Sequence, residues 1–384
     1  AGEKLRAFLK DAKFKYDIGM NDLVHKPSYS ALEFAEFSIL ANAMKLQIFR
    51  SFEKHIKKYF KDPKILQLLE FPILFLGGTA KNTPALYSLM NYADMRLGTW
   101  YPMGGMHKVV AGMQKLAEEL GAEFVFDQNV ERIVVENRKV SRVETQDGIY
   151  DADYIVSSAD YNHTEQALVG KDYQNYSEKY WDSKVMSPSS LIFYLGINKK
   201  VKGISHHTLF FDEDFSAHAD DIYKDPRWPE KPSFYISCPS KTDTTVAPEG
   251  YENMFILMPV ASGLEDNEET REKYFEMFLD RFEKLSGESI RNNIVFKRSY
   301  AHRDFVKDYN AFKGNAYGLA NTLMQTAFMK PGLKNKKVSN LFYTGQLTVP
   351  GPGVPPALIS GQIVAGEIAK LAGVEKEVKE MVSI

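Results

Sequence analysis

The chain has very little cysteine: one residue, Cys238, among 384. A single cysteine excludes an internal disulfide and a zinc site built from several cysteines, and it is typical of a reducing compartment. Long hydrophobic runs are also missing. The longest nearly apolar stretch, residues 71–76, is far shorter than the roughly 20 residues that a membrane-spanning helix needs. We therefore expect an intracellular protein that is soluble or lies on a membrane surface.

The chain also has no large excess of positive or negative charge. Forty-eight basic and fifty acidic side chains give a net charge of −2, which offers no electrostatic footprint for nucleic acid. Apolar residues make up 44% and aromatic residues 13%, so general disorder is excluded. The first residues, Ala1 to Lys4, lack both a secretory signal pattern and an initiator methionine. From this we expect a processed or truncated chain.

Several common catalytic motifs are absent from the sequence. It contains no P-loop, no Gly-x-Ser-x-Gly elbow and no Gly-x-Gly-x-x-Gly dinucleotide fingerprint. The nearest approach to the fingerprint is Gly351-x-Gly353, which has Pro356 at the third glycine position. His206 and His207 are expected to face opposite ways on a strand, and no third ligand has matching spacing, so we expect structural histidines and no metal site.

The apolar pattern predicts a mixture of helices and strands. A helix is predicted from Ser30 to Ile56, either buried in a core or lining an apolar tunnel or membrane surface. Strands are predicted at 124–126, 130–135, 140–144 and 154–156, with a strand-rich block from 165 to about 300 and a helix near 269–285.

The most informative segment is a strand, a glycine loop and a helix near the C-terminus. The strand at 340–344 delivers the chain to Gly345, and a helix from about Pro356 follows Gly353. Glycines allow a flat ring or a phosphate to touch the backbone, and the helix N-terminus favours an anion. A Pro/Gly-rich structural turn explains the same pattern equally well. A weaker signal of the same kind spans Gly98 to Gly105, where glycines and aromatics precede a helix.

In these and other segments the chain resembles the bacterial-type carotenoid desaturases, the phytoene desaturase or phytoene dehydrogenase family. The segments that carry the resemblance lie in the same order as in that family and cover essentially the whole chain: Trp100-Tyr-Pro-Met-Gly-Gly105-Met, Asn129 to Ile133, Ile155 to Tyr161, His206 to Phe211, Gly314 to Leu319, Asn340 to Gly345, Pro350 to Val354, and Ser360-Gly361.

The resemblance implies an α/β fold with mixed α+β character, of the glutathione-reductase-like FAD-binding type. It implies four regions: a mainly helical region facing substrate or membrane (1–95), part of the FAD-binding domain with β-hairpins (96–165), a substrate domain with a mixed sheet (166–310), and the C-terminal FAD-binding strand–loop–helix (311–384). It also implies a location in the cytoplasm, as a monotopic protein on the inner membrane surface.

The same resemblance implies which residues hold FAD. They are Trp100, Gly104, Gly105, Val130, Ser158, Ala159, Gly345, Gln346, Gly353 and Val354. Two departures stand out. The family's N-terminal Gly-rich FAD fingerprint is missing from this chain, and Gln346, Leu347 and Val349 replace residues that are small or polar in the family.

The implied activity is dehydrogenation of phytoene or a related forty-carbon polyene, with hydride transfer to the flavin. Asp94 and Arg96 are candidates for acid or base, and a surface ion pair is the alternative for both. Three other functions stay open: a saturase or isomerase of the same family, a relative of the amine oxidases, and a non-catalytic lipid-binding protein.

Overall fold

The computed structural model describes residues 2–34 and 44–374. Its α-helices are α1 (Gly2–Ile18), α3 (Phe52–Ile56), α4 (Pro63–Phe75), α5 (Leu89–Tyr92), α6 (His107–Glu119), α7 (Tyr161–His163), α8 (Glu178–Asp182), α9 (Phe215–Tyr223), α10 (Glu268–Ser286), α11 (His302–Tyr309) and α12 (Val354–Ala372). Its strands are β1 (Val130–Glu136), β2 (Lys139–Thr145), β3 (Ile149–Asp151), β4 (Ile155–Ser157), β5 (Ser189–Ile197), β6 (His207–Phe210), β7 (Phe234–Ser237), β8 (Glu252–Val260), β9 (Ile294–Tyr300) and β10 (Leu341–Tyr343). Short turns of 3-10 or π helix include η2 (Ala31–Phe34), η4 (Ala93–Leu97) and η12 (Ala327–Met329).

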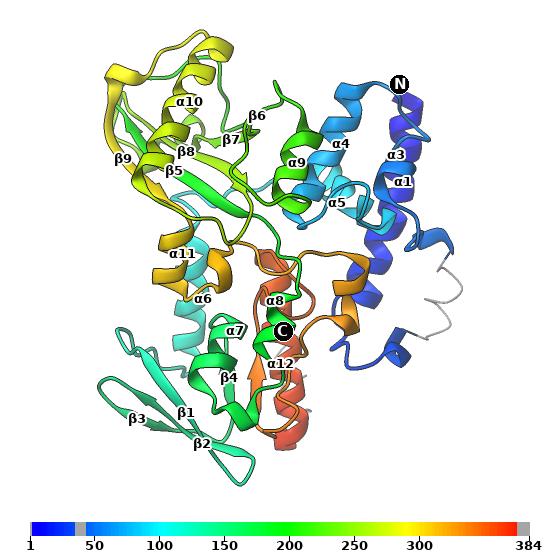
Figure 1. Ribbon diagram of the computed structural model, residues 1–384, viewed down its shortest axis with the longest axis vertical. Helices are drawn as coiled ribbons and strands as arrows, with labels where there is room; N and C mark the ends of the chain where they lie inside the picture. The colour runs from blue at the N-terminus through cyan, green and yellow to red at the C-terminus, as the bar shows by residue number, and fades with distance from the viewer. Residues whose placement is uncertain (1, 35–43, 375–384) are drawn as a thin grey trace.

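These elements form an upper and a lower half (Figure 1). The upper half has a sheet with α10 on one side of the molecule and helices α1, α4 and α9 on the other. The lower half contains the small sheet β1–β2–β3, helix α6 and the C-terminal helix α12.

The large sheet has the strand order β6–β7–β8–β5–β9, and every neighbouring pair is antiparallel. One face is covered by α10, whose residues Phe275, Phe278 and Phe282 are buried in the same cluster as the inward side chains of β5 and β8. The helix begins where the Asn267 side chain accepts a hydrogen bond from the Thr270 N–H, and it ends at Gly287 in the left-handed conformation. The strand-rich upper half therefore has an apolar core of its own.

The small parallel pair β4–β10 carries the predicted strand–loop–helix. Leu341 pairs with Ile155 and Tyr343 with Ser157, so both strands end at the same edge. Parallel strands need a long crossover, and here the whole upper sheet lies between them in the sequence. Helix α12 then packs back through Ile363 and Val364, which share a core cluster with β10.

The two outer edges of this pair differ. On the β10 side, Tyr343 N donates to Leu333 O at 2.8 Å, and Asn335 N donates to Leu341 O at 2.9 Å. The β4 side has no strand partner among the described residues, and its apolar residue Val156 is 45% exposed. Exposed apolar edges are unusual for parallel strands, which normally lie inside a sheet.

Helix α6 presents a second uncovered surface. None of its residues is buried. Exposed apolar side chains follow one another at helical spacing along it and continue into the segment after it: Val110, Met113, Leu116, Leu120, Phe124, Val125 and Phe126. The strand predicted at 124–126 is not formed, because no neighbouring strand pairs with it in the described structure.

The predicted helix from Ser30 to Ile56 is wrong in the part that the structure describes; residues 35–43 lie outside that part. The η2 turn ends at Phe34, the chain turns at Gln47 with a positive φ of 53°, and α3 begins anew after its N-cap Ser51. The serine accepts from Lys54 N, which explains the new start.

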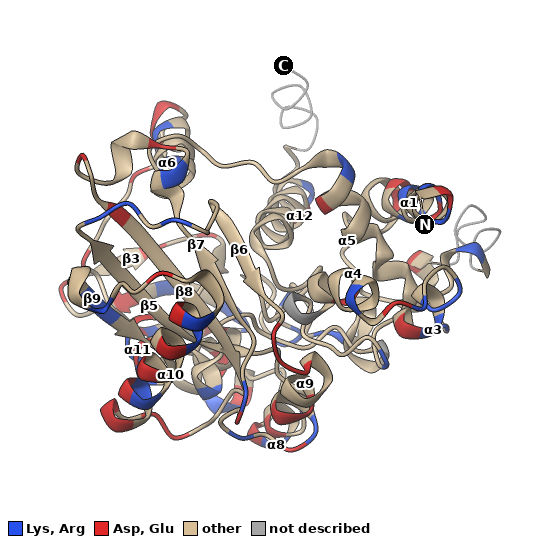
Figure 2. Cartoon of the chain, turned by 90° about the horizontal axis from the view of Figure 1, so that it is seen from above, with Lys and Arg blue, Asp and Glu red and all other residues tan. Residues whose placement is uncertain are grey.

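Within the described ranges, no helix combines the length and the apolar character that crossing a bilayer requires. Charged residues of both signs lie mainly on outer elements such as α1, α6, α9 and α10, while the middle of the molecule around α12, α5 and β6 is mostly uncharged (Figure 2).

Candidate functional site

The ends of β4 and β10 form an open cradle. Thr344 N donates to Ser157 O at 2.9 Å, and Gly345 N donates to Ser360 Oγ at 2.9 Å. Gly345 has a φ of +99°, and a Cβ built on it would meet no atom nearer than Ser158 O at 4.0 Å. The structure thus brings Ser158, Gly345 and their neighbours Ala159 and Gln346 together beside open space.

The N-terminus of α12 completes one wall of the cradle. Its N-cap, Gly353, has a φ of +112°, and no side chain caps the helix. Because Pro355 and Pro356 have no N–H, the first turn offers backbone donors only at Gly353 and Val354. The Val354 side chain is 62% exposed. The N-terminus of α12 therefore combines the positive end of the helix dipole, few N–H donors and an exposed apolar side chain.

Polar side chains under the loop hold it in place. Asp160 accepts hydrogen bonds from Phe312 N at 2.9 Å and from His163 N at 3.1 Å. Burial raises the pKa of Asp160 in spite of these donors. The next layer is Asn315, whose Oδ1 accepts from Gln346 Nε2 at 3.1 Å. The Gln346 side chain therefore helps to fix the loop.

The loop 98–105 is tied to the upper half. Gly104 N donates to Asp243 Oδ2 at 2.6 Å, and Tyr101 OH donates to the same oxygen at 3.3 Å. Hydrogen bonds, first that from the Thr245 hydroxyl, lower the pKa of Asp243 to about 2. Trp100 is 88% exposed, although its indole N–H is bonded to Leu97 O. No hydrogen bond joins this loop, with Gly105, to residues 345–354 in the described structure.

The remaining predicted residues are more scattered. Val130 begins β1 and packs against the core cluster that also holds Tyr343. Asp94 and Arg96 are exposed on η4, where Asp94 accepts a 3.4 Å hydrogen bond from Thr99. No ion pair between these two is found within the described residues.

The orientation expected for the adjacent histidines is wrong. His206 and His207 do not face apart; their rings stack with centroids 4.3 Å apart, because His206 precedes β6 and is not held by the strand pleat. His206 Nδ1 lies 2.7 Å from Thr242 Oγ1. No group of three or more potential metal ligands gathers anywhere in the described part of the chain.

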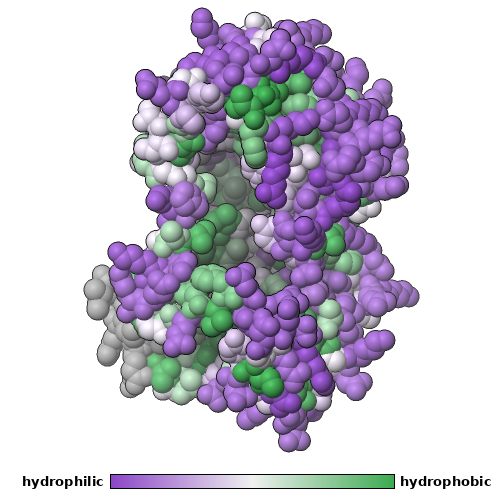
Figure 3. All heavy atoms as spheres, turned by 90° about the vertical axis from the view of Figure 1, so that its left-hand side faces the viewer, coloured by the Kyte–Doolittle hydropathy of each residue, from purple (hydrophilic) through white to green (hydrophobic). Residues whose placement is uncertain are grey.

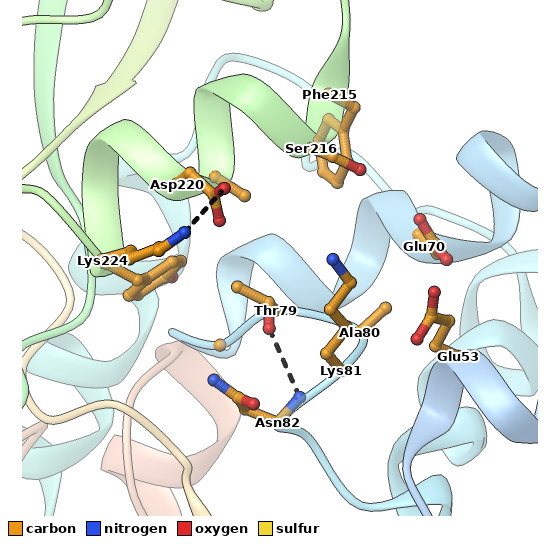
Figure 4. Close-up of a pocket in the computed structure, with 13 residues that line it drawn as sticks. Glu53, Glu70, Thr79, Ala80, Lys81, Asn82, Phe215, Ser216, Asp220 and Lys224 are labelled. Carbon is orange, nitrogen blue, oxygen red and sulfur yellow. Dashed lines mark hydrogen bonds and ion pairs between the residues drawn. The ribbon is translucent and has the colours of Figure 1, made fainter.

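A polar pocket of about 410 Å³ lies between α4 and α9, and the sequence gives no sign of it. In Figure 4 the carboxylates of Glu53 and Glu70 face each other across one side of it, with Lys81 nearby. The pKa of Glu70 is raised, mainly by burial and further by Glu53. This pocket suits a polar ligand.

In contrast, hydrophobic side chains line a hollow at the waist of the molecule (Figure 3).

Comparisons with known proteins place this geometry in context. Residues 3–369 match the family described as flavin containing amine oxidoreductase. The chain is 38% identical to a carotenoid 3,4-desaturase of Haloarcula japonica over 367 residues, which covers 95% of this chain and 74% of that protein. It is 28% identical to a zeta-carotene-forming phytoene desaturase of Myxococcus xanthus, over 93% of this chain and 69% of that protein.

Solved structures share the fold. A putrescine oxidase superposes with a TM-score of 0.56 at 11% identity, covering 100% of this chain and 76% of the other. An oxidoreductase from Methanosarcina mazei gives a TM-score of 0.56 at 16% identity, covering 88% of this chain and 78% of the other.

Proposed function

Since the chain belongs to the flavin containing amine oxidoreductases and, within them, to the FAD-dependent carotenoid desaturases, we propose that it dehydrogenates phytoene or a related forty-carbon polyene. The observation that carries this proposal is the 38% identity to a carotenoid 3,4-desaturase along 95% of the chain. The chain is an oxidoreductase, its cofactor is FAD and its fold is of the α/β flavoprotein type.

The cradle fits the ring end of FAD. Gly345 leaves open space where a Cβ would stand, and Val354 is an exposed apolar residue beside an uncapped helix end. We therefore assign the ring to Ser158, Ala159, Gly345, Gln346, Gly353 and Val354, with Trp100, Gly104 and Gly105 on a second side and Val130 toward the adenine. FAD, when bound, accepts the electrons that the substrate C–H bond gives up.

The pyrophosphate end of FAD lacks such a fit. The sequence has no Gly-x-Gly-x-x-Gly turn, and the α12 N-terminus has two prolines where a phosphate would need N–H donors. The unpaired edge of β4 and the apolar face of α6 are uncovered next to this region of the fold. We assign the pyrophosphate to a strand–glycine turn–helix unit that pairs with β4 and covers α6.

The chain's own residues then orient the polyene and exclude water. An apolar substrate agrees with the mostly uncharged middle of the molecule and with the hydrophobic hollow at its waist (Figures 2 and 3). Residues 1–95 and 166–310 would shape the substrate path, and 96–165 and 311–384 would hold the cofactor. Asp94 and Arg96 are the assigned proton-handling residues, since both precede the ring-facing loop.

We assign the protein to the cytoplasm, on the inner membrane surface, because its substrate dissolves only in the bilayer. The supporting feature is a pair of apolar side chains, Met44 (90% exposed) and Phe49 (91% exposed), with Lys45 and Arg50 beside them in sequence. Apolar side chains flanked by basic ones favour an anionic lipid surface.

The test is product analysis. The FAD-loaded protein is mixed anaerobically with phytoene in liposomes, and flavin bleaching and polyene absorbance are recorded. We expect bleaching together with a polyene of longer conjugation. Gly345→Val should weaken FAD binding at least tenfold, about 1.4 kcal/mol, because it places a branched side chain at positive φ in the cradle. Gly170→Val, at an ordinary φ in an exposed turn, is the matched control. If FAD binds but neither phytoene nor another carotenoid bleaches it, the proposal is wrong.

A further inference from the structure

Lys330 is a buried lysine without a partner. The residue is only 4% exposed, and its Nζ atom has no hydrogen bond or ion pair to any described residue. An uncompensated ammonium ion is strongly unfavourable in such a place. Among the described residues, no group supplies the negative charge that an ammonium ion would need there.

A buried acceptor without a donor lies beside it. Asn321 is 4% exposed, and its Oδ1 atom has no partner within the described structure. Both groups face Gly351: a Cβ built there would lie 3.2 Å from Asn321 Oδ1 and 3.4 Å from Lys330 Nζ. The missing side chain at Gly351 thus leaves an amine and an amide oxygen directly against the cofactor loop.

Lys330 and Asn321 lie close to the loop that forms the cradle. Thr348 Oγ1 donates to Pro331 O at 2.7 Å, which ties the Lys330 segment to the loop. Gly351 comes two residues before Gly353, the N-cap of α12, whose positive dipole end disfavours a second positive charge nearby.

In the part of the chain that the structure describes, no ionisable neighbour compensates for the burial. The segments 318–325 and 345–353, which contain Asn321 and Gly351, have no titratable side chain. Tyr87 reaches the same segment through Thr326, and burial raises its pKa, so it stays neutral. Burial alone lowers the pKa of Lys330 to about 7.

We propose that Lys330 is a positioning residue of the cofactor cradle, whose amine takes up a proton from solvent and donates to Asn321 Oδ1 when negative charge arrives at the N-terminus of α12. This inference rests on the proposed function, because reduction of bound FAD brings that charge. The balance is two electrons and one proton on the ring, with one further proton on Lys330.

The pH dependence of the FAD midpoint potential follows from the two protonation states of the Lys330 amine. Above about pH 7 it is neutral beside the oxidised ring, whereas nearby negative charge holds it protonated to higher pH. In that window, reduction consumes two protons for two electrons. Each proton changes the equilibrium tenfold per pH unit, which is about 30 mV for a two-electron couple. We expect a midpoint potential that falls by about 59 mV per pH unit in the wild-type holoenzyme.

The experiment measures that slope for FAD bound to the full enzyme between about pH 7.5 and about pH 9. Lys330→Met should lower the slope to about 30 mV per pH unit, and Lys330→Arg, which stays charged, should do the same. Lys336→Met removes an exposed lysine nearby and should leave the wild-type slope. An equal slope in wild type and Lys330→Met would overturn the inference while FAD binding upholds the proposed function; absence of FAD binding even by the protein that carries the strand–glycine turn–helix unit would overturn both.

A second measurement needs neither a variant nor FAD. Nitrogen-15 NMR of the lysine side chains should show one amine that titrates near pH 7 in the wild-type chain, well below the usual value of about 10.4. If every lysine titrates near its usual pKa, the inference is wrong.

Discussion

Asp243 shows how much one residue contributes to the geometry of the site. It joins the loop 98–105 to the upper half by accepting from Gly104 N and Tyr101 OH. We expect Asp243→Ala to speed hydrogen exchange of the Gly104 amide at least tenfold, since a charge-assisted hydrogen bond is lost. Exchange measured by NMR or mass spectrometry checks this.

Asp225→Ala is the matched control, because that carboxylate is exposed and pairs only locally with Arg227. The pH dependence gives a further check on Asp243. Its pKa of about 2 in the fold lies below the usual 3.8, so its contribution is complete above about pH 4 and is lost as the pH falls toward 2. Unchanged exchange at Gly104 in Asp243→Ala would contradict this role.

Residue types alone could identify the glycines of the cradle but not its buried partners. Gly345 and Gly353 were predictable because glycine at a strand–helix junction has a local meaning. Lys330, Asn321 and Asp243 carry no local signal: each acquires its role from a contact partner distant in sequence or from burial, and only the fold supplies these.

At the scale of elements, the stretch around α3 carries the proposed membrane contact. We expect Met44→Ser with Phe49→Ser to weaken binding to anionic phospholipid vesicles at least tenfold, because two exposed apolar side chains no longer insert. Sedimentation with vesicles measures this. Val295→Ser with Phe296→Ser, which removes two other exposed apolar side chains (57% and 55% exposed) from β9, should change little. Equal losses in both double variants would contradict a contact through α3.

Elements with local causes were predictable, and elements that need a partner were not. The predicted helix near 269–285 is found as α10, since its N-cap and its terminal glycine lie in the sequence itself. The hairpin β1–β2 is found as well, because its turn residues Asn137 and Arg138 both take the positive φ that a tight two-residue turn requires. The segment 124–126 has a strand pattern but forms no strand, because pairing requires a neighbour that the described chain does not place there.

For the whole molecule, we propose that the cofactor site is divided. In this proposal the ends of β4 and β10 with α12 hold the ring, while the open edge of β4 and the exposed apolar face of α6 suit contact with the unit that holds the pyrophosphate. The sequence shows that the glycine fingerprint is missing, but the open edge of β4 is visible only in the structure.

The most direct test is a titration of FAD into the purified 384-residue chain, and into the same chain joined at its N-terminus to a strand–Gly-x-Gly-x-x-Gly–helix segment of the family. Flavin absorbance and fluorescence quenching report binding. We expect weak binding by the chain alone and tight, stoichiometric binding by the extended protein. Tight binding by the chain alone would contradict a divided site, and no binding by either protein would contradict the flavoenzyme assignment itself.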